Sequence, residues 1–350
     1  MRILLIFVFA LLIMPASGFA RDDLFTEEEL ETLNKKIDSL GDEWGGKKSK
    51  EEIWKELKEP LLKPKRSLKL QSYETNTLGY TNDKNDVDYM DFKLSLKYPI
   101  LHDGEYLGRN TWRYRIPHPY IAFTGRFGQY ITSRKSAPVI GKRFNPKFFF
   151  RYWLGNKDSY LDLGVAHESN GQSIDSQQAY QDLRDDFQNN GEDPDFARDY
   201  ISRGWDYWEM ALKKAIPLKD DKARFSAYLN LKYFLEGGGV QGRPEEYNSW
   251  ENSAEGKLRK SVDGITVTAK YSDGLAGGWF SGYKLALIAT TGYKDTFKYN
   301  SLRGEFTKKI FDIPFMLWVS DGYQSDLIDY YQRVKSWGIA IELRNYLDQI

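Results

Sequence analysis

Apolar and polar residues alternate with a period of two along most of the chain from Leu68 onward. This period is typical of β-strands, whose successive side chains point to opposite faces of a sheet. The alternating stretches are about ten to fourteen residues long, enough to cross a bilayer at a tilt. Their apolar positions run through residues 90–100, 148–154, 225–233, 265–271, 283–289, 315–319 and 337–343.

The opposite face of these stretches carries lysines, arginines and glutamates. A membrane barrel keeps such charges in its lumen, where they pair with one another, and turns the apolar face to lipid. A soluble sandwich also alternates, but its strands are usually shorter. We therefore predict an all-β fold for residues 68–350, an antiparallel transmembrane β-barrel of about twelve strands.

The connections between the predicted strands differ in length at the two ends of the barrel. Those at one end are short, whereas the other end has long connections at residues 132–145, 170–202 and 236–256. Short periplasmic turns and long outer loops are the expected asymmetry of outer-membrane barrels. We therefore expect the long connections to lie on the outer side of a Gram-negative outer membrane.

The first 67 residues do not alternate. Residues 1–20 begin with Arg2, continue with an apolar run and end in small residues, a pattern typical of a signal peptide. Residues 21–67 open with Thr26 followed by three glutamates, a capping sequence that predicts charged helices. We expect them to form a solvated periplasmic extension, with a partner-binding segment as the alternative.

The composition narrows the choice of function. Fifty basic and fifty acidic residues give zero net charge, which argues against a nucleic-acid partner. The 24 tyrosines and 10 tryptophans fit the aromatic girdles of a membrane barrel. With no cysteine, the exported chain must be stabilised by packing and by the hydrogen bonds of its strands.

One predicted strand, residues 160–169, carries candidate chemistry on its apolar face. Alternation places His167 and Ser169 on the same side as Leu163 and Val165. Two residues apart on a strand, their Cα atoms lie roughly 6.5 Å from each other, close enough for a hydroxyl to reach an imidazole. The pair would face lipid at the outer end of the fifth strand, where the substrate could be the lipid itself.

The next strand offers an acid for the same face. Asp206 alternates in register with Trp208 and Met210, and so is expected beside His167 on the neighbouring antiparallel strand. A carboxylate facing lipid is costly unless it is paired. We predict Ser169 as nucleophile, His167 as base and Asp206 as the group that holds the imidazole. The alternative is that Asp206 lies unpaired at the level of the lipid head groups.

Several segments together resemble the outer membrane phospholipase A family, in the same order over about residues 70 to 345. The first is His167-Glu168-Ser169-Asn170-Gly171, followed by Ser202-Arg203-Gly204-Trp205. The others are Tyr73-Glu74-Thr75-Asn76 with residues 92–99, Ser136-Ala137-Pro138 with Asn145-Pro146, and Gly322-Tyr323 with residues 325–330. The resemblance implies a twelve-stranded barrel that hydrolyses acyl esters of phospholipids or lysophospholipids (phospholipase A1/A2), uses calcium and is active as a dimer.

The resemblance also implies roles for single residues. Gly171 matches the glycine whose backbone N–H donates to the oxyanion. The calcium ligands match the carbonyl oxygen of Gln172, the hydroxyl of Ser202 and, from a second subunit, Ser136. Such hard oxygen donors suit Ca²⁺ completed by water.

Three features depart from the family pattern. Asp206 stands where the family often has asparagine, and Gly125 where it has an interface glutamine. The connection at residues 172–202 is longer and rich in acids, which could bind further calcium or could be a solvated acidic loop. A non-catalytic outer-membrane channel or structural barrel is the alternative function, and a soluble β protein that binds a partner is a third.

Overall fold

The computed structural model describes residues 70–83, 88–100, 117–131, 139–154, 158–218, 223–235, 257–273, 282–311, 313–323 and 326–343. Within these ranges most residues lie in strands, and short helices occur in two of the connections. The elements are β1 (Gln71–Ser72), β2 (Asn76–Asp83), β3 (Asp88–Pro99), β4 (His118–Tyr130), β5 (Val139–Trp153), β6 (Tyr160–Ser169), α4 (Gln177–Asn189), η3 (Pro194–Tyr200), β7 (Gly204–Leu218), β8 (Ala223–Phe234), α5 (Arg259–Val262), β9 (Gly264–Asp273), β10 (Tyr283–Gly292), β11 (Asn300–Ile310), β12 (Ile313–Gly322) and β13 (Val334–Leu343).

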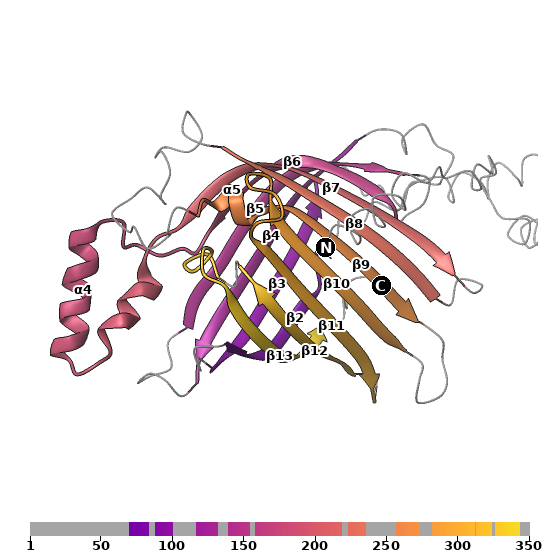
Figure 1. Ribbon diagram of the computed structural model, residues 1–350. Helices are drawn as coiled ribbons and strands as arrows, with labels where there is room; N and C mark the ends of the chain where they lie inside the picture. The colour runs from indigo at the N-terminus through magenta and orange to yellow at the C-terminus, as the bar shows by residue number, and fades with distance from the viewer. Residues whose placement is uncertain are drawn as a thin grey trace, which may run out of the picture.

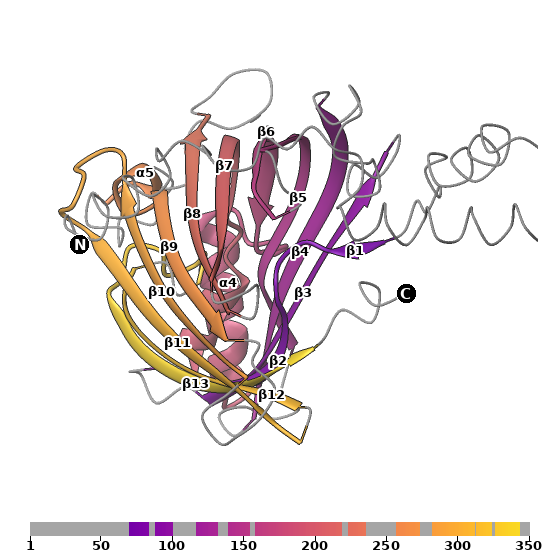
Figure 2. The same ribbon diagram turned by 90° about the vertical axis from the view of Figure 1, so that its right-hand side faces the viewer.

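The strands form a closed ring. Each strand from β2 to β13 pairs antiparallel with the next, and β13 pairs with β2, while the two-residue β1 adds a short extension beside β3. Figures 1 and 2 show these strands curving around a common axis, with α4 projecting at one end. The described ranges therefore confirm the predicted antiparallel barrel of twelve strands. Closure leaves no strand edge without partners, as a hydrocarbon surrounding requires.

The outer wall of the barrel is apolar. On β6, Leu163 and Val165 are 39% and 37% exposed, and Trp208 on β7 is 57% exposed. Similar exposed side chains continue around the wall on β10 to β13. Soluble proteins rarely expose a contiguous apolar surface of this extent, and so the wall fits lipid and disfavours the soluble alternative.

Charged side chains inside the barrel pair with one another. Arg151 forms a two-pronged contact with Asp162 at 2.7 Å, and Lys147 lies 2.8 Å from Glu209. Both pairs are almost fully buried, so each charge depends on its partner to offset the loss of water. The polar face of the sequence pattern is therefore the lumen face.

The outer end of the lumen is filled with apolar and aromatic side chains. Val262 of α5 and Leu327 and Tyr330 of the β12–β13 connection are fully buried there. They pack against lumen-facing residues of β7, including Trp205, whose ring meets that of Tyr330 edge-on at 5.4 Å. The interior at this end is thus a packed core rather than an open mouth.

Some sequence expectations lie outside the described residues. The predicted signal peptide (1–20) and the whole predicted periplasmic extension (21–67) belong to this group and stay predictions. The outer connection expected at 132–145 is partly wrong, since β5 begins at Val139 and continues through Pro146. Among the helices that the structure describes, none has the length and apolar character needed to span a membrane.

Candidate active site

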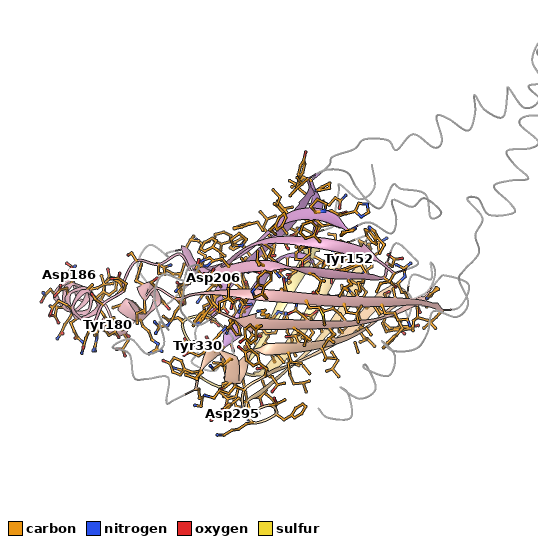
Figure 3. All side chains as sticks on the ribbon, turned by 90° about the horizontal axis from the view of Figure 1, so that it is seen from above. Tyr152, Tyr180, Asp186, Asp206, Asp295 and Tyr330 are labelled. Carbon is orange, nitrogen blue, oxygen red and sulfur yellow. The ribbon has the colours of Figure 1, made fainter. Side chains whose placement is uncertain are left out.

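The predicted catalytic residues lie on the adjacent strands β6 and β7. The register pairs His167 with Asp206 and Ser169 with Gly204, while Val165 pairs with Trp208 one step further down the wall. All three pairs point outward, because alternation from the exposed Val165 brings His167 and Ser169 to the same face. Figure 3 places Asp206 on the part of the barrel nearer α4, with Tyr152 toward the other end.

His167 and Asp206 are hydrogen-bonded. The Nδ1 atom of the imidazole lies 2.8 Å from Oδ1 of the carboxylate. The His167 side chain is 46% exposed and that of Asp206 16%, so the acid lies below the ring and closer to the wall. The lipid-facing carboxylate thus has the partner that its position requires.

Ser169 shares the outward face with His167, across from Gly204. A side chain at Gly204 would begin 3.4 Å from Cε1 of His167 and 3.5 Å from Cβ of Ser169. Glycine at this position therefore keeps a side chain out of the space between the imidazole and the hydroxyl. Within the described strands, His167 bonds Asp206 and no hydrogen bond joins it to Ser169. The hydrogen bond between a catalytic serine and its histidine often forms fully only when substrate binds.

Gly171 follows β6 in a conformation that glycine alone adopts easily. Its φ of 67° lies in the left-handed region, and a Cβ there would come within 2.7 Å of the Phe144 ring. The residue is exposed at the outer end of the strand, two positions after Ser169. This turn ends the ladder next to the hydroxyl and turns the backbone toward the Ser202 segment.

The segments that carry Gln172 and Ser202 lie side by side. Ile174 and Ile201 form a parallel bridge, and the Ser202 N–H donates to the Ile174 carbonyl at 2.7 Å. A carbonyl and a hydroxyl on these segments are hard, neutral oxygen donors, which fit Ca²⁺. Across the described residues, no group of three or more His, Cys, Asp or Glu side chains could hold a metal. Ser136, the third predicted ligand, lies outside the described residues.

The acidic connection contains helices that the sequence pattern did not reveal. Ser176 caps α4 by accepting the Ala179 N–H, and Phe187 packs on Tyr200 of η3. The signal was present as apolar residues at helical spacing within the acidic run. Figure 3 shows Tyr180 and Asp186 of α4 well away from Asp206. The acids of this helix therefore lie apart from the candidate site.

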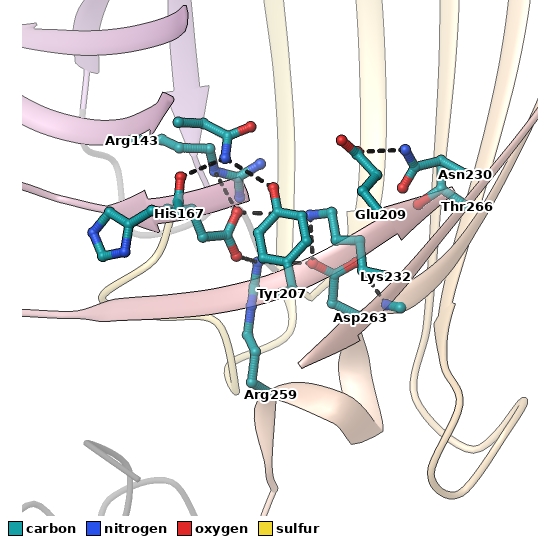
Figure 4. Close-up of polar contacts among 12 residues, drawn as sticks. Arg143, His167, Tyr207, Glu209, Asn230, Lys232, Arg259, Asp263 and Thr266 are labelled. Carbon is teal, nitrogen blue, oxygen red and sulfur yellow. Dashed lines mark hydrogen bonds and ion pairs between the residues drawn. The ribbon is translucent and has the colours of Figure 1, made fainter. Parts of the chain in front are cut away.

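A buried ion cluster lies on the lumen side of the same strands. Glu168, between His167 and Ser169, contacts Arg259 of α5 at 2.6 Å and Lys232 at 3.6 Å. Asp263 contacts the same two cations at 2.8 and 3.0 Å. Figure 4 shows the His167 ring pointing away from this cluster. Burial alone would raise the pKa of the Asp263 carboxyl, but Lys232 and Arg259 hold that pKa below its ordinary value.

On the other side of β6, the β5 strand presents Pro146 near His167. The paired residues of these strands jump from Phe144–Ser169 to Lys147–Ala166, and Pro146 lies in the interruption. Proline has no N–H and so cannot donate a backbone hydrogen bond there. The Asn145 side chain fills this role, because its Nδ2 donates to the His167 carbonyl at 2.6 Å and to Tyr207 Oη at 2.8 Å. Asn145 therefore holds the backbone of the histidine, a function that its sequence neighbours did not indicate.

Comparison with solved structures identifies the fold. The barrel is similar to outer membrane phospholipase A. The Salmonella typhi outer membrane phospholipase, a dimer with bound calcium, matches with a TM-score of 0.53 and 16% identity over 81% of this chain and 95% of its own. The Escherichia coli enzyme matches with a TM-score of 0.51 and 16% identity, over 79% of this chain and 99% of its own. An active-site mutant of that enzyme matches with a TM-score of 0.52 and 15% identity, over 81% of this chain and 95% of its own.

At these identities the similarity to outer membrane phospholipase A is one of fold. No protein-family model and no curated protein matches the sequence. The predicted resemblance to that family is thus confirmed for the fold. Evidence for a catalytic activity comes from the residues on β6 and β7.

Proposed function

We propose that the protein is a calcium-dependent outer-membrane phospholipase that hydrolyses acyl esters of phospholipids or lysophospholipids. The observation that carries the proposal is the hydrogen-bonded His167–Asp206 pair, two residues from Ser169, on the outer wall of a closed barrel. A hydroxyl, an imidazole and a carboxylate in this order are the residue set of a serine hydrolase. Here the set faces lipid, and the substrate is accordingly a membrane lipid.

The proton moves along the line from Ser169 to His167. With Nδ1–H donating to Asp206, the Nε2 atom of His167 is free to accept the proton of the Ser169 hydroxyl. The serine oxygen then attacks the ester carbonyl, and the imidazolium returns its proton to the leaving alcohol. Water hydrolyses the acyl-serine by the same route, and Asp206 stabilises the imidazolium in both halves.

Negative charge develops on the ester oxygen during both attacks. We assign its stabilisation to the backbone N–H of Gly171, on the turn that follows Ser169. Calcium, when bound, would lower the energy of that charge through its bound water. The Gln172 carbonyl and the Ser202 hydroxyl would hold the ion, and Ser136 of a second copy would complete its ligands in a calcium-dependent homodimer.

The position of the site explains how a lipid reaches it. A phospholipid that diffuses in the outer leaflet can lay its acyl chains against Leu163, Val165 and Trp208, directly below His167 and Asp206. Its ester then lies at the level of the catalytic residues, where hydrocarbon meets the head groups. The enzyme consequently needs no deep pocket.

Replacement of the nucleophile tests the proposal. Ser169→Ala should abolish release of fatty acid from mixed phospholipid–detergent micelles, while the barrel keeps its heat-modifiable migration in gels. Ser226→Ala, a serine of β8 that pairs with Ala215 at the opposite end of β7 from Asp206, is the matched control and should keep wild-type activity. Excess chelator should also stop hydrolysis, and added calcium should restore it. Full activity in Ser169→Ala would refute the mechanism, and activity in chelator would refute the calcium requirement.

The channel alternative has less support in the structure. The lumen is polar, but Arg151–Asp162 and Lys147–Glu209 are paired, and aromatic residues fill its outer end. We expect no steady conductance in planar bilayers. Conductance steps from a protein without hydrolytic activity would favour the channel.

A further inference from the structure

Asn170 is buried between two more accessible parts of the candidate site, Ser169 and Gly171. It follows Ser169 and precedes Gly171, yet only 3% of it is exposed. Its Nδ2 donates to the Ile201 carbonyl at 2.7 Å, and its Oδ1 accepts the Arg203 N–H at 2.9 Å. One side chain therefore binds the backbone on both sides of Ser202.

The strand ladder opens immediately after this residue. The Asn170 N–H donates to the Arg203 carbonyl at 3.0 Å, and the next bond across the two segments comes from the Ile174 N–H to Tyr200. Residues 171–173 lie between these two closures. The bonds of the Asn170 side chain hold the two segments together at the end nearer the nucleophile.

We propose that Asn170 is a positioning residue that sets the Ser202 hydroxyl relative to the Gly171 N–H and the Gln172 carbonyl. This inference rests on the proposed function, since it concerns the groups that would hold calcium and the oxyanion. An amide is suited to this place because it donates and accepts in opposite directions without charge. An aliphatic side chain of the same size offers neither bond, and a carboxylate offers only acceptors.

Two substitutions separate the two bonds. Asn170→Leu keeps the volume and removes both. Asn170→Asp keeps the acceptor for the Arg203 N–H but sets an oxygen against the Ile201 carbonyl, which the native amide contacts at 2.7 Å.

Asn76 provides the matched control at the other end of the barrel, where β2 begins. It is also buried, its Oδ1 accepts the Ser95 N–H at 2.5 Å and its Nδ2 donates to Ser72 Oγ at 3.3 Å. Asn76→Leu therefore removes the same kind of bonds without touching the loop at 171–173. Any general loss of barrel stability appears in this variant as well.

The experiment measures calcium affinity by calorimetry in detergent, and kcat at saturating calcium, for the wild type and the three variants. We expect both Asn170 variants to weaken calcium binding about ten-fold or more, as outer-shell substitutions typically do. Their kcat should also stay below wild type at saturating calcium, because the Gly171 N–H is displaced. Asn76→Leu should lower the unfolding temperature and leave the calcium affinity unchanged.

Folding is checked separately for each variant. If Asn170→Leu does not fold, the calcium affinity of Asn170→Asp decides alone, because this variant keeps the acceptor for the Arg203 N–H and loses the donor to the Ile201 carbonyl.

Two results overturn the proposal. These are wild-type calcium affinity in a folded Asn170 variant, and an equal loss of affinity in Asn76→Leu. A wild-type protein that neither hydrolyses phospholipid nor binds calcium refutes the proposed function itself, and the role of Asn170 falls with it. Hydrolysis by the wild type with unchanged Asn170 variants refutes the role of Asn170 alone.

Discussion

The charge of Asp206 should contribute less to catalysis than its ability to accept a hydrogen bond. At the observed 2.8 Å, a full charge pair would interact by about 1.5 kcal/mol in water and about 6 kcal/mol at an effective dielectric constant of 20. Because the pair lies where hydrocarbon meets the hydrated head groups, and 46% of the His167 side chain is exposed there, screening by water brings the net effect to about 1 kcal/mol. Asp206→Asn keeps an oxygen acceptor, and should lower kcat only about five-fold.

Removal of the acceptor should cost much more. Asp206→Ala loses the charge and also a hydrogen bond to a charged group, which contributes about 1.5–3 kcal/mol. The imidazole is then free to turn away from Ser169, and we expect kcat to fall about 10²- to 10³-fold. KM should change little in both variants, because neither substitution alters a side chain that contacts the acyl chains.

The assay follows fatty-acid release from micellar phospholipid at saturating calcium, with folding checked by heat-modifiable migration. Asp321→Asn is the control, since Asp321 is another carboxylate at a strand end and pairs with Arg333 at 2.7 Å. It should keep wild-type kcat. A loss of 10³-fold in Asp206→Asn would refute the screening estimate. Near wild-type activity in Asp206→Ala would show that the carboxylate merely lies at head-group level.

Two further predictions concern the space above the site and the cluster beneath it. Gly204→Leu should abolish hydrolysis in an intact barrel, because its side chain would fill the gap between His167 and Ser169, whereas Gly204→Ala should retain most activity, since its methyl makes ordinary contacts. Asp263→Asn should lower the free energy of unfolding at pH 7 by about 3 kcal/mol, as it leaves Arg259 without one partner. The folded carboxyl has a lowered pKa, so its contribution should begin to decline as the pH falls below its ordinary 3.8 and be lost below the lowered folded value. Denaturant unfolding of variant and wild type should converge only at that lower pH.

Much of the fold could be predicted because the barrel repeats one local rule. Alternation on β6 and β7 was enough to place His167, Ser169 and Asp206 on one face and to expect the first and last of these to meet. A period of two places successive side chains on opposite faces of the sheet, and antiparallel order places consecutive strands side by side. These are short-range relations that a single sequence displays.

The residues that were missed depend on distant parts of the chain. Glu168 meets Arg259 across 91 positions, and Lys142 meets Asp326 across 184. Periodicity placed Glu168 on the lumen face but could not choose its partner, and Lys142 fell within the connection predicted at residues 132–145. Asn145 was missed for a different reason, since its bond to His167 replaces one that Pro146 cannot donate. The predicted connection ended just before Pro146, whereas β5 runs through this proline, and the Asn145 side chain makes the bond that the proline lacks.

The β6–β7 hairpin has a consequence for how such a site could spread among barrels. Ser169, His167, Asp206, Gly171, Gln172 and Ser202 all belong to these two strands and the connection between them. Barrels of even strand number differ by whole hairpins. A hairpin that holds all of these residues on its lipid-facing side could therefore be transferred to another barrel as one unit. Exchange of residues 160–218 into an inert host barrel would move the nucleophile, base and acid as one unit, provided that the host supplies a partner for Glu168.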